Sequence, residues 1–447
     1  MKKSNMIKSA TSITLLAALA LTGCSATSTS NTSAASAIST SASSSSGTKS
    51  KSADSFSTDV KNGAKLAEDT HYSAKDLTWD SSSEVTIDLS NPTATDGVTV
   101  SDGVITITKA GNYRLSGTYA GQIKVETADS DMVRLILDNA TITNSTGAAI
   151  NVVKADEVVI YTASGTANTV SDGSSYSDTA SGSPDAAIYS KSDLTLAGEG
   201  TLKVEGKYEE GIHTTDGLVI ASGTLEVTAT NTGIKGKDYV DILDGTTSVT
   251  ATKDGIKATN DTDGNRGQAP AGGGAGGGMG GGGTFEVVDA TINIAGGTVT
   301  VNANGDGIDS NGTATLSGGT LIVNGPFTGG NTSLDTNGDL LLNGTTVVAG
   351  NSGDMFEAPS TNSTSGYVKL TNLSNVSNGT TIQVADSSDT VVANYKVVNS
   401  NTSLILVSSS KITKGKSYTV YTTTDSVNAS STSVASNATS LGSFTAS

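Results

Sequence analysis

The chain has very few of the residue types that build the commonest catalytic and structural sites. Its 447 residues include one cysteine, two histidines, three arginines and one tryptophan. A single cysteine excludes a disulfide framework, and a zinc site would need more histidine or cysteine than the chain has. The two histidines, His71 and His213, give no basis for a Ser-His-Asp arrangement. The formal net charge of −17 disfavours nucleic acid and anionic membrane surfaces as partners.

Proline and aromatic residues are also scarce, and on composition alone this scarcity would suggest disorder. Only 5 Pro and 5 Phe accompany 52 Gly, and Ser, Thr and Asn are abundant. However, Val, Ile and Thr occupy alternating positions over long stretches, which favours strands. A solenoid needs little aromatic bulk, because each coil buries small aliphatic side chains against its neighbours. The composition therefore agrees with a folded all-β chain.

The clearest pattern is a repeat with a period of 22 residues. Residues 210–231 align with residues 232–253 without a gap, so that Gly211-Ile212 corresponds to Gly233-Ile234. A third copy opens at Asp254. Inside each copy the apolar residues alternate with polar ones, as they do in strands. Because a period of this length marks stacked repeats, each copy is predicted to form one three-stranded coil of a parallel β-solenoid.

One coil contains a large insertion. Ile212 and Ile220 are 8 residues apart, whereas Ile256 and the equivalent Ile294 are 38 apart. The difference places a Gly-rich insertion loop at residues 260–284, after which the same coil resumes. The register of the coils before Ile150 stays open at this stage.

The first residues predict export and a lipid anchor. Three of the first eight residues are lysine, and an apolar run from Ile13 to Leu21 follows. This run is too short to cross a bilayer. Leu-Thr-Gly then precedes Cys24, which resembles the lipoprotein signal of bacteria. We therefore expect residues 1–23 to be removed and a lipidated Cys24 to hold the protein at the outer face of the cell membrane. The alternative is an ordinary secretory peptide followed by a chance cysteine.

Three further parts follow the signal. Residues 24–57 are almost entirely Ser, Thr and Ala and predict a flexible tether with a span on the order of 30 Å. Residues 58–365 are expected to form the solenoid, and residues 366–447 a C-terminal β cap and tail. Residues between Val159 and Ala186 are expected to contain a loop off one corner. An N-terminal capping segment is expected to cover the open end of the solenoid; its residues are Leu66, His71, Tyr72, Leu77 and Trp79.

Stacked coils place equivalent residues at the strand spacing of about 4.8 Å. The outward position after the inward Ile holds, in successive coils, Tyr189, His213, Lys235, Lys257, Asp309 and Asp335. The position two before that Ile includes Asp254 and Asp306. Stacked carboxylates repel one another, and calcium, which takes oxygen ligands, would remove the repulsion. We therefore predict calcium at Asp254, Asp306, Asp309 and Asp335; the alternative is that these residues only shape turns.

A basic ladder adjoins this acidic group. Lys235 and Lys257 follow His213 in consecutive coils, and together the three are the predicted carbohydrate-binding residues. The metal would meet the carboxylate of one uronate while lysine meets another. The alternative is a solvated charged face without a ligand.

The ordered series of motifs resembles a known family. The motifs are Ala-Ile-Tyr-Ser-Lys-Ser-Asp-Leu-Thr-Leu at 187–196, Gly-Ile-His at 211–213, Asp-Gly-Ile-Lys at 254–257 and Asp-Gly-Ile-Asp at 306–309. They are similar to those of bacterial secreted carbohydrate-binding β-helix proteins, whose fold resembles pectate lyases. The resemblance implies a right-handed parallel β-helix that binds calcium and polysaccharides such as cellulose or pectate, without established catalysis.

Lyase chemistry is the runner-up. β-Elimination from a uronate needs a base beside the metal, yet Arg114, Arg134 and Arg266 all fall outside the ladder. Lys235 or Lys257 would serve only with a lowered pKa. We therefore expect a monomeric, lipid-anchored surface protein that binds polysaccharide and is not an enzyme. The alternatives are a calcium-dependent polysaccharide lyase and a structural or adhesive spacer.

Overall fold

The structure, a computed structural model, describes residues 66–68, 70–260, 286–326, 330–351, 355–371, 373, 376–398, 402–428 and 430–447. The predicted signal, Cys24, the tether and nearly all of the Gly-rich insertion lie outside these residues. Within them, helical structure is confined to two short 3-10 helices, η3 (Ala74–Leu77) and η4 (Ser81–Ser83). No helix in the described part is long and apolar enough to cross a membrane.

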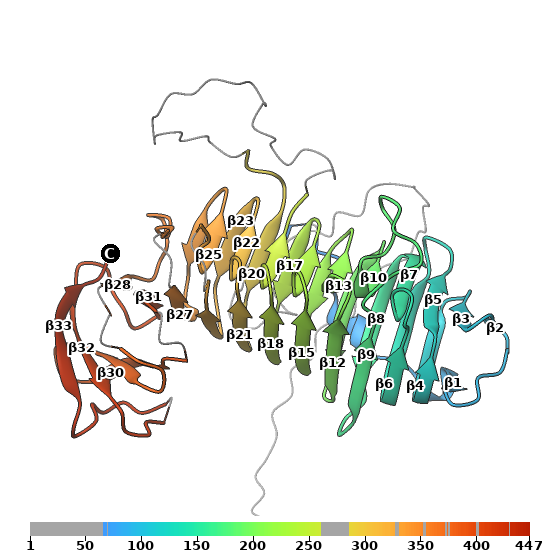
Figure 1. The fold of residues 1–447 in the computed structure, drawn as a ribbon, viewed down its shortest axis with the longest axis horizontal. Helices are drawn as coiled ribbons and strands as arrows, with labels where there is room; N and C mark the ends of the chain where they lie inside the picture. The colour runs from blue at the N-terminus through green and yellow to red at the C-terminus, as the bar shows by residue number, and fades with distance from the viewer. Residues whose placement is uncertain are drawn as a thin grey trace, which may run out of the picture. The chain divides into compact units, whose positions relative to one another are not determined.

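The 22-residue repeat forms three strands per coil, as predicted. One coil contains β13 (Glu210–Thr214), β14 (Leu218–Ile220) and β15 (Thr224–Ala229), and the next contains β16 (Ile234–Gly236), β17 (Tyr239–Ile242) and β18 (Thr246–Ala251). Each strand pairs in parallel with its counterpart one coil later, for example Ile212 with Ile234 and Val227 with Val249. Figure 1 shows these successive strands side by side. The chain is a parallel β-helix.

The coils build two sheets. The ten-stranded sheet contains, besides β13 and β16, the strands β2 (Val98–Ser101), β3 (Val104–Ile107), β5 (Gln122–Glu126), β7 (Ile150–Lys154), β10 (Ala186–Ser190), β19 (Ile256–Ala258), β22 (Ile308–Ser310) and β25 (Leu334–Thr336). The nineteen-stranded sheet contains, besides β14, β15, β17 and β18, the strands β1 (Glu84–Asp88), β4 (Gly111–Ala120), β6 (Met132–Thr143), β8 (Glu157–Thr162), β9 (Ala167–Ser171), β11 (Asp193–Gly198), β12 (Thr201–Gly206), β20 (Thr291–Ile294), β21 (Thr298–Ala303), β23 (Thr313–Leu316), β24 (Thr320–Asn324), β26 (Leu340–Leu342), β27 (Thr346–Asn351), β28 (Tyr367–Thr371) and β31 (Leu404–Ser408).

Aliphatic stacks from successive coils fill the core. Ile212, Ile234, Ile256 and Ile308 are each fully buried, and Ile242 pairs with Ile294 across the insertion. The predicted resumption of the coil after the Gly-rich loop is therefore confirmed. Before Ile150, where the register was open, Ile105, Ile123 and Ile150 continue the same stack.

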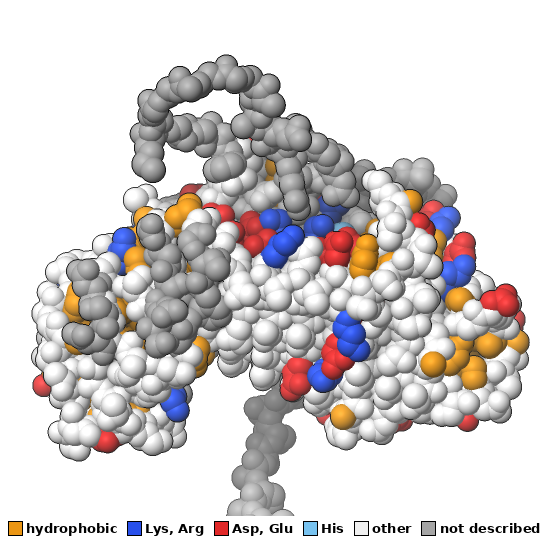
Figure 2. All heavy atoms as spheres, in the orientation of Figure 1, with side chains coloured by type: hydrophobic (Ala, Val, Ile, Leu, Met, Phe, Trp, Pro, Cys, Tyr) orange, Lys and Arg blue, Asp and Glu red, His pale blue; other side chains and the backbone are white. Residues whose placement is uncertain are grey.

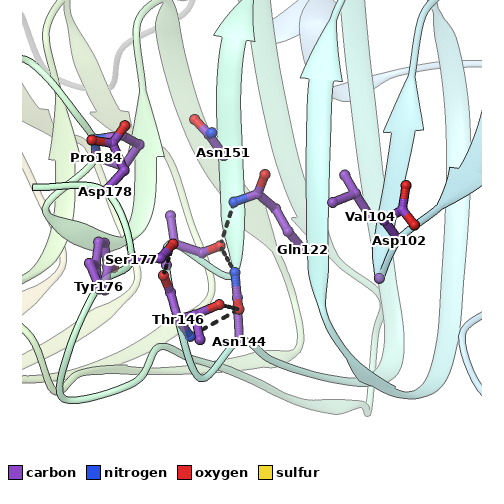
Figure 3. Close-up of a pocket in the computed structure, with 13 residues that line it drawn as sticks. Asp102, Val104, Gln122, Asn144, Thr146, Asn151, Tyr176, Ser177, Asp178 and Pro184 are labelled. Carbon is purple, nitrogen blue, oxygen red and sulfur yellow. Dashed lines mark hydrogen bonds between the residues drawn. The ribbon is translucent and has the colours of Figure 1, made fainter.

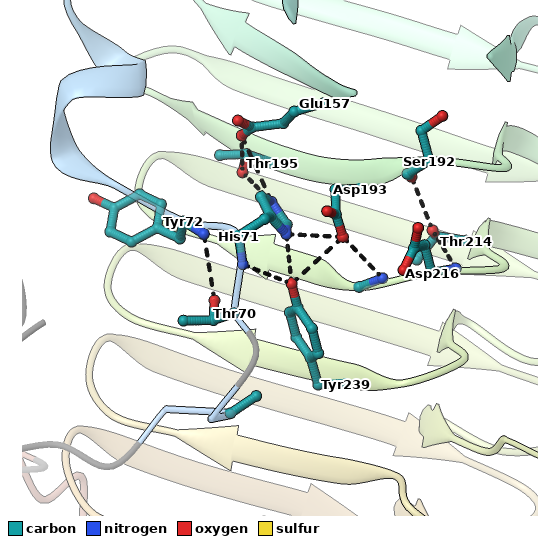
Figure 4. A network of polar contacts seen from close by, with 12 residues as sticks. Thr70, His71, Tyr72, Glu157, Ser192, Asp193, Thr195, Thr214, Asp216 and Tyr239 are labelled. Carbon is teal, nitrogen blue, oxygen red and sulfur yellow. Dashed lines mark hydrogen bonds and ion pairs between the residues drawn. The ribbon is translucent and has the colours of Figure 1, made fainter. Parts of the chain in front are cut away.

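The N-terminal segment differs from the expected end cap. The backbone N–H of Ala67 donates to Asp241 Oδ2 at 3.3 Å, and that of His71 donates to Tyr239 Oη at 2.9 Å. The segment thus crosses the outer face of β8, β11 and β17, in the middle of the helix, instead of covering its end (Figure 4). Outward polar side chains of several coils give the segment its partners there.

The structure also gives the bounds of the predicted corner loop and of the C-terminal part. The loop expected between Val159 and Ala186 is found at residues 172–185, after β8 and β9, which extend to Ser171. Beyond β27, β31 pairs antiparallel with both β27 and β28. The last part forms a four-stranded antiparallel sheet of β29 (Thr381–Ala385), β30 (Val391–Lys396), β32 (Ser417–Thr423) and β33 (Thr439–Thr445).

Candidate functional site

The predicted charged side chains stand in one column on the ten-stranded sheet. We define the charged column as His213, Lys235, Lys257, Asp309 and Asp335. Each member pairs in register with the next, from His213 on β13 to Asp335 on β25. Figure 2 shows Lys and Asp or Glu side chains gathered in one band where Figure 1 has these strands. The repeat thus brings the predicted residues together.

Lys257 joins the basic and acidic parts of the column. Its Nζ contacts Asp309 Oδ2 and lies 3.4 Å from Asp254 Oδ2. Burial alone would lower the pKa of Lys257, but the charges of Asp309 and Asp254 outweigh burial and raise it. The ammonium of Lys257 therefore already neutralises two carboxylates. Lys235, by contrast, makes no ion pair with another described residue.

Asp254, Asp306 and Asp309 converge beside Lys257, with one oxygen from each within 4.8 Å of the others. Asp254 Oδ1 accepts the Asp306 N–H at 3.1 Å, and Asp306 Oδ1 accepts the Thr332 N–H at 2.6 Å. Each of these two carboxylates thus uses one oxygen to join its own coil to the next coil.

Glu357 extends this acidic cluster, which we define as Asp254, Asp306, Asp309, Asp335 and Glu357. Glu357 Oε2 accepts the Thr336 N–H at 2.6 Å, and burial, helped by the nearby charge of Asp335, raises the pKa of Glu357. Glu357 could not be predicted from the repeat, because it follows the last parallel strand and belongs to no repeat.

Burial strongly affects the acidity of this cluster. It raises the pKa of Asp306 to about 7, with the charges of Asp335, Asp309 and Asp254 adding to the effect. Burial likewise raises the pKa of Asp309 to about 6 and that of Glu357 to about 7. Five carboxyl groups thus share one ammonium. A divalent cation with oxygen ligands fits this donor set.

A second acidic group adjoins the other end of the column. Asp185, Glu209 and Glu210 place one oxygen each within 4.8 Å of one another. Glu210 is only 4% exposed, and its Oε2 has no hydrogen-bond partner among the described residues. Burial and the charge of Asp185 raise its pKa to about 8. Glu210 occupies the same repeat position as Asp254 and Asp306, which is the signal that could have identified it.

His213 is fixed by this second group. Its Nδ1 lies 2.6 Å from Asp185 Oδ1, and its ring meets Tyr189 edge-on at 5.3 Å. The side chain is 10% exposed. His213 therefore offers a sugar little surface, and Lys235 is the more accessible of the predicted carbohydrate-binding residues.

A cavity of about 290 Å³ lies at the β3, β5 and β7 end of the same sheet (Figure 3). Its lining includes three amide side chains, two hydroxyl side chains and Tyr176 from the 172–185 loop. Tyr176 stacks on Tyr208 with 4.3 Å between ring centroids. Sequence reasoning missed this cavity because its residues lie outside the regular repeat.

The arginines in the described part are engaged elsewhere. Arg114 Nε donates to Glu84 Oε2 at 2.6 Å, and Arg134 Nε donates to the Asp76 carbonyl at 2.6 Å. Both belong to strands β4 and β6 of the other sheet. Arg266 lies outside the described residues.

Comparison with known proteins agrees with the resemblance expected from the motifs. Residues 101–276 match the model of a family described as carbohydrate-binding domain-containing protein. A protein of that description from Acetivibrio thermocellus is 37% identical over 145 residues, 32% of this chain and 51% of its own length. The chain thus spans about half the length of this relative.

Among solved structures, a polysaccharide lyase-like protein from C. thermocellum, studied as a gadolinium derivative, is similar to this chain. The similarity has 31% sequence identity and a TM-score of 0.49, over 58% of this chain and 95% of that one.

Proposed function

We propose that this protein binds an acidic polysaccharide at the bacterial surface through calcium, a proposal supported by the match of residues 101–276 to the model of carbohydrate-binding domain-containing proteins. The proposed binding surface is the charged column with its acidic cluster. A cellulosic polymer is the alternative ligand.

The observation that carries the proposal is the placement of Lys235 and the acidic cluster in one column. Lys235 and Asp309 are two strand steps apart through Lys257, a distance of roughly 10 Å at the strand spacing. A polymer of uronate units lying across the strands would meet the lysine with one carboxylate and the cluster with another. Without a metal, the cluster would repel that second carboxylate.

Calcium would be held by Asp254, Asp306 and Asp309, whose oxygens converge, with Asp335 and Glu357 beside them. When bound, it would supply positive charge for a uronate carboxylate. The protein's own part is to hold these oxygens in place. Backbone N–H groups of neighbouring coils, such as that of Thr332, bond the carboxylates and orient them.

The same geometry favours binding without catalysis. A lysine base must lose its proton near neutral pH, and the raised pKa of Lys257 works against this loss. Arg114 and Arg134 are held by partners in the other sheet. The lyase alternative makes a distinct prediction, namely an unsaturated uronate product when acidic polysaccharides are incubated with protein and calcium.

The surface location rests on Cys24 and the tether. We expect the intact protein to partition into detergent, and Cys24→Ser to shift it to the aqueous phase, because the acyl chains would be lost. Unchanged partitioning of Cys24→Ser would remove the anchor from the proposal while leaving glycan binding intact.

The test of the binding function is a titration of purified protein with a galacturonate hexamer, with and without calcium. We expect binding with calcium, and a loss of about tenfold or more in Lys235→Ala, since a charge-assisted contact is worth roughly 1.5–3 kcal/mol. A surface spacer without a sugar site would bind no glycan under either condition.

A further inference from the structure

The cavity lies on the same ten-stranded sheet as the charged column. Asn151 on β7 pairs in register with Tyr189 on β10, which pairs with His213. Asn151 therefore lies in the line of side chains that leads to Lys235, whereas Gln122 on β5 stands beside that line, whose β5 member is Lys124. Three strand steps, roughly 14 Å, separate Asn151 from Lys235. One extended polymer can contact both.

The amide groups of the cavity are held in place by the backbone. Gln122 Nε2 and Asn144 Nδ2 both donate to the Ala148 carbonyl, each at 2.9 Å (Figure 3). Asn144 Oδ1 accepts the N–H of Thr146 at 3.2 Å and its hydroxyl at 3.3 Å. These bonds fix the orientation of the side chains before any ligand arrives, which lowers the entropic cost of binding.

Hydrogen-bonding capacity remains at the cavity floor. Within the described part of the chain, neither Gln122 Oε1 nor the Asn151 amide bonds another residue. An amide offers both donors and an acceptor, and each sugar hydroxyl also donates and accepts. The two groups thus match a polyhydroxylated ligand.

The charges around the cavity exclude a uronate at this position. Asp102 and Asp178 contribute to the lining, and no lysine or arginine does. The neighbouring Lys124, in register with Asn151, already pairs with Glu126 at 2.7 Å, so the lining itself offers a sugar carboxylate only like charge. The ligand that fits is uncharged.

The wall of the cavity connects it to the second acidic group. The Tyr176 hydroxyl lies 2.9 Å from Asp172 Oδ2 and 2.8 Å from the Ala186 carbonyl, so that the 172–185 loop is tied at both ends. Pro184 lines the cavity, and the next residue, Asp185, contacts His213. Tyr189 and His213, which lie between Asn151 and Lys235, are buried, so a polymer that contacts both the cavity and Lys235 would pass over this loop.

We propose that this cavity is a subsite for an uncharged hexopyranose unit of the same polysaccharide whose acidic unit contacts Lys235. The inference rests on the proposed function and adds that the preferred polymer carries both neutral and acidic sugars. The same cavity would also be the binding site of the alternative ligand, a cellulosic polymer.

Calorimetric titration of the full-length protein with two probes, cellohexaose and a galacturonate hexamer, tests the subsite. We expect Gln122→Ala/Asn151→Ala to weaken cellohexaose binding by about tenfold or more, since two hydrogen bonds are lost, and to change galacturonate binding by less than about threefold. Lys235→Ala should show the opposite pattern. Asn91→Ala, which removes an exposed amide far along the chain from the cavity residues, is the matched control.

The outcomes separate the two proposals. Equal cellohexaose affinity in wild type and double variant overturns the subsite, as does galacturonate binding without any cellohexaose binding; in both cases the acidic site stands. Cellohexaose binding that depends on Gln122 and Asn151, without galacturonate binding, supports the subsite and contradicts the acidic site. If neither hexamer binds, both proposals fail. Asn151→Asp, which keeps the side-chain shape but lacks its donors, replaces the double variant if that variant does not fold.

Discussion

Lys257 determines how the acidic cluster is neutralised in the absence of metal. Its ammonium contacts Asp309 and lies 3.4 Å from Asp254, and the side chain is only 24% exposed. It stands where a bound cation would act on the same carboxylates. At the scale of single residues, Lys257 and calcium are therefore expected to compete for the same carboxylate groups.

Lys257→Met keeps the length of the side chain and removes its charge. We expect calcium affinity to rise by about tenfold or more, because one unit of positive charge leaves the cluster. The metal-free protein should lose roughly 1–3 kcal/mol of stability, since two carboxylates lose their partner. Calcium titration and urea unfolding measure both effects, with Lys235→Met as the control. An unchanged or lower calcium affinity would place the metal elsewhere.

Glycine before the inward Ile is a second feature at the residue scale. A Cβ on Gly233 would lie 2.2 Å from Val249 Cγ1 and 2.7 Å from the Gly255 carbonyl oxygen. Gly211 and Gly307 meet Val227 and Val323 in the same way. Glycine therefore recurs before the inward Ile because two strands of the same coil approach too closely there for a Cβ atom.

Gly233→Ala is expected to destabilise the protein by about 1–3 kcal/mol through overpacking. Val249→Ala makes room for the new methyl group, so the double variant should lose less stability than the two single changes added together. Urea unfolding of the four proteins measures this coupling. Strict additivity would show that the contact with Val249 is not the reason for the glycine.

At the scale of elements, the N-terminal segment is held to the helix by a buried histidine. His71 Nδ1 lies 2.5 Å from Tyr239 Oη and 3.1 Å from Asp193 Oδ1, and Nε2 lies 2.9 Å from Thr195 Oγ1 (Figure 4). Burial lowers the pKa of His71, but the hydrogen bond and charge of Asp193, with the charges of Glu157 and Asp241, raise it overall. The protonated form thus joins the segment to carboxylates of three strands.

The attachment of this segment should therefore depend on pH. A histidine whose pKa is raised by folding stabilises the folded state fully below its ordinary value of 6.5 and loses that contribution as pH rises through the raised value. Hydrogen exchange in residues 70–80, corrected for its intrinsic pH dependence, should show lower protection at pH 9 than at pH 6. His71→Gln should show weak protection with little pH dependence. Equal protection of the wild type at both pH values would contradict this role.

At the scale of the whole molecule, buried carboxyl groups set the pH dependence of stability. Burial raises the pKa of Glu210 to about 8, and those of Asp306 and Glu357 to about 7. The folded state therefore holds more protons than the unfolded chain between pH 5 and 8, and stability falls as pH rises through that range. Calcium would replace those protons at the acidic cluster.

Thermal melts at several pH values test this expectation. The Tm of the metal-free protein should fall from pH 5 to pH 8, and saturating calcium should remove most of the fall. Asp306→Asn/Glu357→Gln should flatten the metal-free curve, because two of the responsible carboxyl groups are gone. A Tm that rises over this range without metal would contradict the account.

The regular repeat made much of the fold and of the charged column predictable. In stacked coils, residues one period apart in the sequence are neighbours on adjacent strands. Once the length of the insertion is subtracted, the period therefore predicts that Lys257 lies beside Asp309. Glu357 and Asp185 were missed because they lie in loops, where no period relates sequence to position. The cavity was missed because several of its residues, such as Gln122 and Asn144, precede Ile150, where the repeat is too irregular to give a register. The N-terminal segment was misplaced for a similar reason: its partners, including Asp193 and Asp241, come from separate coils, and its own sequence does not specify them.

The central claim is that calcium at the acidic cluster makes the column a binding surface for acidic polysaccharide. One measurement tests it most directly: the affinity for a galacturonate hexamer as calcium is varied, in wild type and in Asp306→Asn/Asp309→Asn. We predict that wild-type affinity rises with calcium and that the double variant loses this dependence while keeping its fold. Equal galacturonate affinity at all calcium concentrations, or a variant that behaves as wild type, would contradict the claim.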